Sequence, residues 1–284
     1  MQVVRPGPLT TVRGLGRRGV AHLGVPRAGA LDGPALGAAN RLVGNGPAAA
    51  GLETTLGGVA LRALGPVLIA VTGAPAPVTV DGRTAAWGAP VAVPAGAVVA
   101  VDAATAGVRG YLAVAGGIAV PPVLGSRSAD LLSGLGPAPL TAGDRLPVGT
   151  PSPYRDRADP VPLPAPPAEL VLRLRLGPRA DWFAPSAVDR LARDGYRVSA
   201  TSNRIGLRTE GPAVDRAPEG ELPSEGMVLG AVQIPPDRQP VVFLADHPTT
   251  GCYPVIGVVP AADPAAAAQA QPGTPVRFVL LRKR

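Results

Sequence analysis

The chain has 284 residues, which is enough for one large domain or two ordinary ones. Hydrophobic residues make up 46% and aromatic residues only 3%, so the core is built from Val, Leu, Ala and Ile, and the apolar content excludes a disordered chain. The net charge of +7 comes from scattered arginines, and no basic patch with interleaved aromatics indicates nucleic-acid binding. Because Lys283 is the one lysine, the sequence also excludes a P-loop, a Schiff base and covalent biotin.

Compartment and membrane signals are also informative. Cys252 is the single cysteine, so no internal disulfide can form and a reducing compartment is compatible. The first residues lack the apolar core of a secretion signal. The most apolar stretch, residues 89–101, is interrupted by prolines and a glycine and is too short to span a bilayer. We therefore expect a cytoplasmic protein with no membrane partner.

Three short segments carry helix signals. The first, residues 32–43, has Asp32 as a candidate N-cap and a proline in its first turn. A second helix is expected over residues 186–194, where a glycine follows the last apolar position. A third is expected over residues 263–269, with Asp263 as its cap.

The remaining chain shows short apolar runs separated by Gly, Pro or Asp-Gly, which is the pattern of strands and turns. Strands are expected at residues 59–64, 67–72, 77–80, 90–94, 98–101, 108–115, 169–176, 197–201, 205–209, 240–245, 255–259 and 275–281. The dipeptide Asp81-Gly82 predicts a hairpin turn. Strands spaced in this way favour barrels or sandwiches over a parallel sheet with intervening helices.

A proline-rich stretch interrupts the strand pattern at residues 150–167. Such a composition makes an extended, semi-rigid linker. We therefore predict two β-rich domains, at residues 1–155 and 156–284.

The first domain carries two unusual polar segments. The glycine-rich segment 13–19 allows close backbone approach, and Arg17 is suited to binding a carboxylate or phosphate, although a turn-rich barrel edge is the more common explanation. Farther on, Ser126, Arg127 and Asp130 lie within five residues. Arg127 is a candidate to hold an anion and Asp130 to move or orient a proton. An Arg–Asp pair that pins a loop explains the same residues equally well.

The second domain adds polar side chains in the turns between its strands. These candidates are Arg204, Glu225, Gln233, Asp246, His247, Thr249, Thr250 and Tyr253. Asp246, His247 or Glu225 is suited to proton transfer, and Thr250 with backbone N–H groups to holding an oxyanion. No Cys/His cluster has metal-ligand spacing, so no metal is expected. We predict one small-molecule site where the two domains meet; the alternative is that these residues hold loops and the domain interface together.

The ordered succession of motifs resembles one family over nearly the whole chain. The motifs lie at residues 24–26, 29–32, 39–45, 52–58, 125–128, 177–183, 202–208, 224–226 and 246–253. They resemble the family of the 5-oxoprolinase C subunit, also called allophanate hydrolase subunit 2, which is similar to the second half of the carboxyltransferase domain of urea amidolyase. The resemblance implies a mainly β fold of two cyclophilin-like β-barrel domains with a few short helices.

The resemblance also implies partners and an activity. A sister B subunit of the Kip inhibitor type and an A subunit would complete a hydrolase that opens 5-oxoproline to glutamate, with ATP used by the complex and the chain inactive alone. Two alternatives stay open: a carboxyltransferase component that uses biotin on another chain, and a regulatory antagonist of a kinase inhibitor. The sequence departs from the family at Gly14, where relatives usually have Asp, and at Cys252, where they have Gly.

Overall fold

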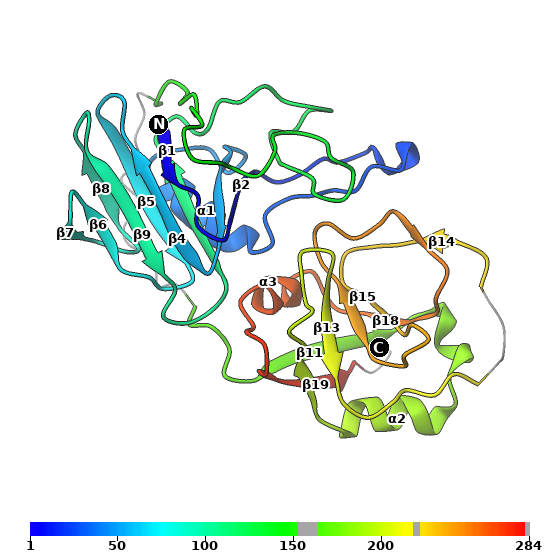
Figure 1. Cartoon of the computed structure of the whole chain (residues 1–284). Helices are drawn as coiled ribbons and strands as arrows, with labels where there is room; N and C mark the ends of the chain where they lie inside the picture. Colours follow the sequence, from blue (N-terminus) through cyan, green and yellow to red (C-terminus); the bar gives the residue numbers. More distant parts are fainter. Residues whose placement is uncertain (153–163, 218–221, 282–284) are drawn as a thin grey trace. The chain divides into compact units, whose positions relative to one another are not determined.

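The computed structural model describes residues 1–152, 164–217 and 222–281. The chain divides into two compact units (Figure 1). Unit 1 comprises Met1–Arg17 and Ala28–Pro166, and unit 2 comprises Arg18–Arg27 and Pro167–Arg284. The predicted boundary between residues 155 and 156 lies outside the described residues.

Unit 1 contains two five-stranded antiparallel sheets. The first has the order β1 (Gln2–Arg5), β4 (Gly57–Arg62), β9 (Val98–Ala103), β6 (Val78–Val80) and β7 (Arg83–Ala85). The second has the order β2 (Leu9–Arg13), β3 (Gly51–Thr55), β10 (Arg109–Val114), β5 (Val67–Gly73) and β8 (Pro90–Val93). Leu61 and Val99 of one sheet and Leu52 and Leu112 of the other belong to a single buried apolar core.

The local sequence signals of unit 1 act as predicted. Helix α1 (Gly33–Leu42) begins after Asp32, whose carboxylate accepts a hydrogen bond from the Ala35 backbone N–H at 3.0 Å. Asp81 and Gly82 both have positive φ, 48° and 76°, as a two-residue hairpin turn between β6 and β7 requires.

Unit 2 contains a closed barrel of seven strands. Around the barrel the order is β11 (Leu170–Leu176), β18 (Val255–Val258), β15 (Ala231–Gln233), β16 (Val241–Phe243), β13 (Gly206–Glu210), β12 (Tyr196–Val198) and β19 (Pro275–Leu280). The other elements are a ribbon of β14 (Glu225–Gly226) and β17 (Thr250–Gly251), the helices α2 (Pro185–Arg193) and α3 (Asp263–Ala267), and the 3-10 helices η1 (Ala21–Leu23) and η2 (Pro178–Trp182).

Alternation along the strands separates the two faces of the barrel. Leu170, Leu172 and Leu174 of β11 are at most 1% exposed, while the residues between them are exposed. Residues paired on neighbouring strands share a face, and by this register Val232 of β15 and Val242 of β16 point into the barrel like the three leucines. Both valines are fully buried. The neighbouring positions of β15 and β16 therefore lie on the outer face.

The predicted mainly β fold of two barrel-like units with a few short helices is confirmed. One helix cap differs: Asp263 does not cap α3, because its carboxylate accepts hydrogen bonds from the Arg173 backbone N–H (2.8 Å) and guanidinium. The third helix also ends at Ala267, earlier than expected. No helix in the described part of the chain is long and apolar enough to cross a membrane.

Candidate functional site

Arg17 organises a loop of unit 1. Its side chain is almost fully buried, its Nε donates to the Val123 carbonyl (3.2 Å), and its Nη2 donates to the Ser128 carbonyl (2.7 Å). Within the same loop, the Ser126 hydroxyl accepts a hydrogen bond from the Ser128 backbone N–H at 3.1 Å. These contacts fix the shape of the loop, and a role for Arg17 and Ser126 in substrate binding stays a prediction.

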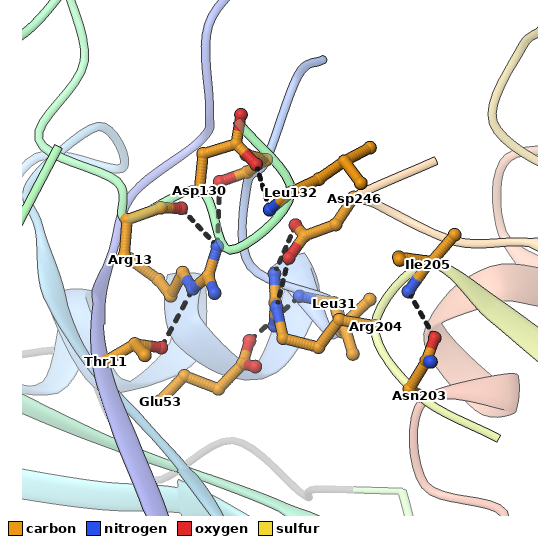
Figure 2. A network of polar contacts seen from close by, with 12 residues as sticks. Thr11, Arg13, Leu31, Glu53, Asp130, Leu132, Asn203, Arg204, Ile205 and Asp246 are labelled. Carbon is orange, nitrogen blue, oxygen red and sulfur yellow. Dashed lines mark hydrogen bonds and ion pairs between the residues drawn. The ribbon is translucent and has the colours of Figure 1, made fainter. Parts of the chain in front are cut away.

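Asp130 closes the turn that follows this loop. One carboxylate oxygen accepts from the backbone N–H groups of Leu132 (3.0 Å, Figure 2) and Ser133 (3.3 Å), and the other accepts from the Ser133 hydroxyl. Arg127 does not pair with it; instead its Nε donates to the Val120 carbonyl at 2.8 Å from an exposed position. Asp130 and Arg127 therefore each hold a loop separately, and their proposed chemical roles stay predictions.

Glu53 is a buried carboxylate of unit 1 to which sequence reasoning gave no role. It is 2% exposed, and its Oε2 accepts from the Tyr111 hydroxyl (2.9 Å) and the Leu31 backbone N–H (3.0 Å, Figure 2). Arg13 is fully buried nearby in the sheet, with its Nε donating to the Thr11 hydroxyl at 2.9 Å. A charged residue within the otherwise uncharged strand β3 is the sequence signal that could have identified Glu53.

In unit 2, Arg204 and Asp246 form a buried bidentate ion pair (Figure 2). The Nε–Oδ2 distance is 2.8 Å, the Nη2–Oδ1 distance is 3.0 Å, and the side chains are 4% and 1% exposed. Backbone hydrogen bonds from Asp246 to Arg204 and from Leu244 to Ile205 extend the pairing of β16 with β13 beyond the strand ends. The pair thus links two turns of the barrel through backbone and side chain together.

His247 lies next to this pair and is suited to accept a proton. Its ring stacks on Phe243 with a centroid separation of 6.0 Å, and its Nδ1 lies 2.7 Å from the Pro248 carbonyl. Because a carbonyl only accepts, Nδ1 carries the hydrogen and Nε2 of the neutral ring keeps a lone pair. Burial lowers the pKa of His247, aided by the charge of Arg27 and opposed by the Pro248 hydrogen bond and Asp246. The ring is therefore neutral at neutral pH.

Glu225 is held as an ionised carboxylate. The Arg179 Nε donates to its Oε1 at 2.9 Å, and this hydrogen bond is the main reason that the pKa of Glu225 is lowered. Glu225 pairs with Gly251 in the β14–β17 ribbon, and Gly226 pairs with Thr250. Glu225 can therefore accept a further hydrogen bond, and its lowered pKa makes it a weaker base. Arg179 is a partner that sequence reasoning did not identify.

Two further candidates line a cavity of about 160 Å³ in unit 2, Gln233 and Tyr253. The Gln233 Nε2 donates to the Tyr253 carbonyl at 3.1 Å. Thr249 lies beside the ribbon, where its carbonyl accepts from the Met227 backbone N–H. Among the residues that the structure describes, no group of three or more His, Cys, Asp or Glu side chains could hold a metal ion.

These features define a protein of two β-rich units whose loops hold buried arginines and carboxylates. The family of the carboxyltransferase domain, subdomains A and B, matches residues 23–280, and the chain belongs to this family.

Several relatives match almost the whole chain. It is 38% identical to the C subunit of 5-oxoprolinase from Escherichia coli, with 98% of this chain and 90% of the relative covered, and the predicted resemblance is confirmed. It is 31% identical to urea amidolyase of Saccharomyces cerevisiae, covering 99% of this chain and 16% of that protein.

Two crystal structures agree with these matches. TTHA0988 superposes with a TM-score of 0.89 at 38% identity, over 98% of this chain and 55% of that one. Urea amidolyase of Kluyveromyces lactis gives a TM-score of 0.91 at 29% identity, over 99% of this chain and 18% of that one. The chain thus spans about half of TTHA0988 and a small part of the urea amidolyases.

Proposed function

We propose that the chain is the C subunit of an ATP-dependent 5-oxoprolinase, an enzyme that converts 5-oxo-L-proline to L-glutamate. The chain acts together with the A and B subunits and is inactive alone. One observation carries the proposal: the match with the C subunit of the Escherichia coli 5-oxoprolinase covers 90% of that relative as well as 98% of this chain. The match therefore covers most of both proteins, whereas a urea amidolyase contains the same region as a minor part.

The proposal assigns ATP to the complex as a whole, and neither of two cavities in the described part of the chain favours a triphosphate. One cavity of unit 1, about 740 Å³, is lined by apolar, proline and glycine residues without charged side chains. The cavity of unit 2, about 160 Å³, is well below the roughly 300–1,000 Å³ of pockets that hold drug-sized ligands.

Opening a cyclic amide requires a base for the attacking water, a holder for the oxyanion and a cation for the substrate carboxylate. We assign the base to the Nε2 lone pair of His247, which the Pro248 contact leaves available. Arg204 and Asp246 act through position, since their bidentate pair fixes the turn from which His247 projects. The hydroxyl of Thr250 and nearby backbone N–H groups are the candidates for the oxyanion.

Carboxyl transfer is the second candidate, favoured by the TM-score of 0.91 with urea amidolyase of Kluyveromyces lactis. With no interior lysine for attachment, biotin would have to be carried by another chain. The two functions differ in co-substrates: 5-oxoprolinase needs ATP and 5-oxoproline, whereas carboxyl transfer needs a carboxylated biotin carrier and urea.

The test is reconstitution with the A and B subunits. We expect ATP-dependent glutamate formation by the assembled complex and none by the chain alone. His247→Gln should lower the turnover of the complex at least about a hundredfold, the usual loss for a positioned base, without impairing assembly. His22→Gln is the matched control, because His22 lies exposed in η1. Turnover by the isolated chain, or a complex that carboxylates urea but leaves 5-oxoproline intact, would contradict the proposal.

A further inference from the structure

The cavity of unit 2 lies on the outer face of the barrel, over strands β13, β15 and β16. Three residues paired in register across these strands line it: Gln233 pairs with Val241, and Val241 pairs with Arg208. Phe243 lies two residues along β16 and so shares their face. Val232 and Val242, at the alternate positions, are fully buried in the barrel interior. The cavity is therefore built on regular strands and not on loops alone.

The Gln233 side chain supplies a hydrogen-bond acceptor to this cavity. Gln233 is 6% exposed, and its Nε2 donates to the Tyr253 carbonyl at 3.1 Å. Its Oε1 accepts no hydrogen bond from the residues that the structure describes. Glycine at position 251 leaves room for this side chain, because a Cβ there would lie 3.1 Å from the Gln233 Nε2. An amide oxygen without a protein donor can accept from a ligand that supplies an N–H group.

A cation lies at the edge of the same cavity. The Arg208 side chain is exposed, and its guanidinium makes no hydrogen bond or ion pair to any described residue. Its backbone N–H is fixed by the Ser202 hydroxyl at 3.0 Å. An unpaired guanidinium is suited to bidentate recognition of a carboxylate.

The remaining wall restricts the shape of the ligand. The ring of Phe243 lines the cavity and also stacks on His247, the proposed base. The Asn203 Oδ1 accepts from the backbone N–H groups of Ile205 (2.8 Å) and Gly206 (3.2 Å), which leaves its Nδ2 to donate to a ligand oxygen. An aromatic wall, a donor, an acceptor and a cation in about 160 Å³ suit a small, flat molecule.

We propose that this cavity binds a small cyclic amide that carries a carboxylate. Arg208 and the Asn203 Nδ2 bind the carboxylate, and the Gln233 Oε1 accepts from the ring N–H. The choice of 5-oxo-L-proline among such molecules rests on the proposed function, whereas the cavity and its polar groups do not.

The experiment titrates the full chain with three probes by calorimetry and NMR: 5-oxo-L-proline, 2-pyrrolidinone (no carboxylate) and N-methyl-5-oxoproline (no N–H). We expect 5-oxoproline to bind at least about tenfold tighter than either analogue. Arg208→Gln should weaken 5-oxoproline about tenfold and leave 2-pyrrolidinone unchanged. Gln233→Met should remove the preference over the N-methyl analogue. Arg175→Gln, an exposed arginine of β11 outside the cavity, is the matched control.

The outcomes separate the cavity from the proposed function. If the variants bind all probes like the wild type, or if no probe binds up to its solubility limit, the cavity proposal is wrong. If the assembled complex hydrolyses 5-oxoproline with a KM that neither variant changes, the function stands and the cavity proposal fails. Binding that depends on Arg208 and Gln233 without hydrolysis by the complex supports the cavity and refutes the function. Should Gln233→Met fail to fold, the exposed Arg208→Gln variant decides alone.

Discussion

Removing Arg204 should strongly destabilise unit 2. In Arg204→Met the side-chain length is kept, but the Asp246 carboxylate loses two hydrogen bonds of 2.8 and 3.0 Å at a position 1% exposed to water. Breaking one side of such a buried pair typically costs about 3–5 kcal/mol, a large part of the roughly 5–15 kcal/mol that stabilises a domain. The double variant Arg204→Met/Asp246→Leu should be more stable than Arg204→Met, because the buried carboxylate is removed together with the guanidinium.

The assay is urea unfolding followed by tryptophan fluorescence. Trp182 lies in unit 2 and Trp87 in unit 1, so a Trp87→Phe background reports on unit 2 alone. Arg277→Met is the control: its pair with Glu169 lies about half exposed on the same barrel, and its loss should leave the unfolding midpoint unchanged. A loss below about 1 kcal/mol for Arg204→Met, within the range of surface pairs, would refute this reasoning.

Three further predictions concern His247, Gly116 and Cys252. Burial lowers the pKa of His247 below its ordinary value of 6.5, so the unfolded chain binds this proton more tightly. The free energy of unfolding should be fully maintained above about pH 6.5 and fall as the pH is lowered towards the folded-state pKa. In His247→Gln the urea midpoint should depend less on pH in this range, and an unaltered pH dependence would contradict the assignment. Gly116→Ala should lower the free energy of unfolding more than Gly143→Ala, because both glycines have positive φ but only at Gly116 would the Cβ clash with a carbonyl oxygen, that of Gly149. The control Gly143→Ala should lower the free energy of unfolding by roughly 1–3 kcal/mol in chemical denaturation. Equal losses in the two variants would show that the close contact at Gly116 is relieved. The exposed thiol of Cys252 should react with a thiol reagent in the native protein, and Cys252→Ser should abolish the signal without changing the melting temperature; a thiol that reacts only after unfolding would disprove this.

Local features of the fold could be predicted because their causes lie within a few residues. Asp32 caps α1 and Asp81-Gly82 turns a hairpin, since side chain and backbone conformation decide both. The Asp263 cap failed for the opposite reason: a strand far away in the sequence, at Arg173, offers this carboxylate a backbone N–H and a guanidinium. A local capping preference is overridden when a residue distant in the sequence binds the same side chain more strongly.

The types of residue in the candidate site could be predicted from the sequence, but the partners with which they pair could not. Arg204 and Asp246 both stood out as polar residues in turns, but their pairing depends on the alignment of β13 with β16. The position of Arg208 on the same face as Gln233 likewise follows from register across three strands, which the sequence pattern does not specify. Grouping Arg18–Arg27 with the second unit was also beyond sequence reasoning, because no composition change marks this segment.

The parallel pairing of β11 with β19 has a consequence for synthesis of the protein. These strands join Leu170 with Val276 and continue in step to Leu280, so they close the barrel although almost all of unit 2 lies between them along the chain. A growing polypeptide cannot make this contact until β19 has left the ribosome, and closing so long a loop is slow. Until then the inward leucines of β11 stay exposed, and chaperones that bind apolar segments would meet β11 during this interval.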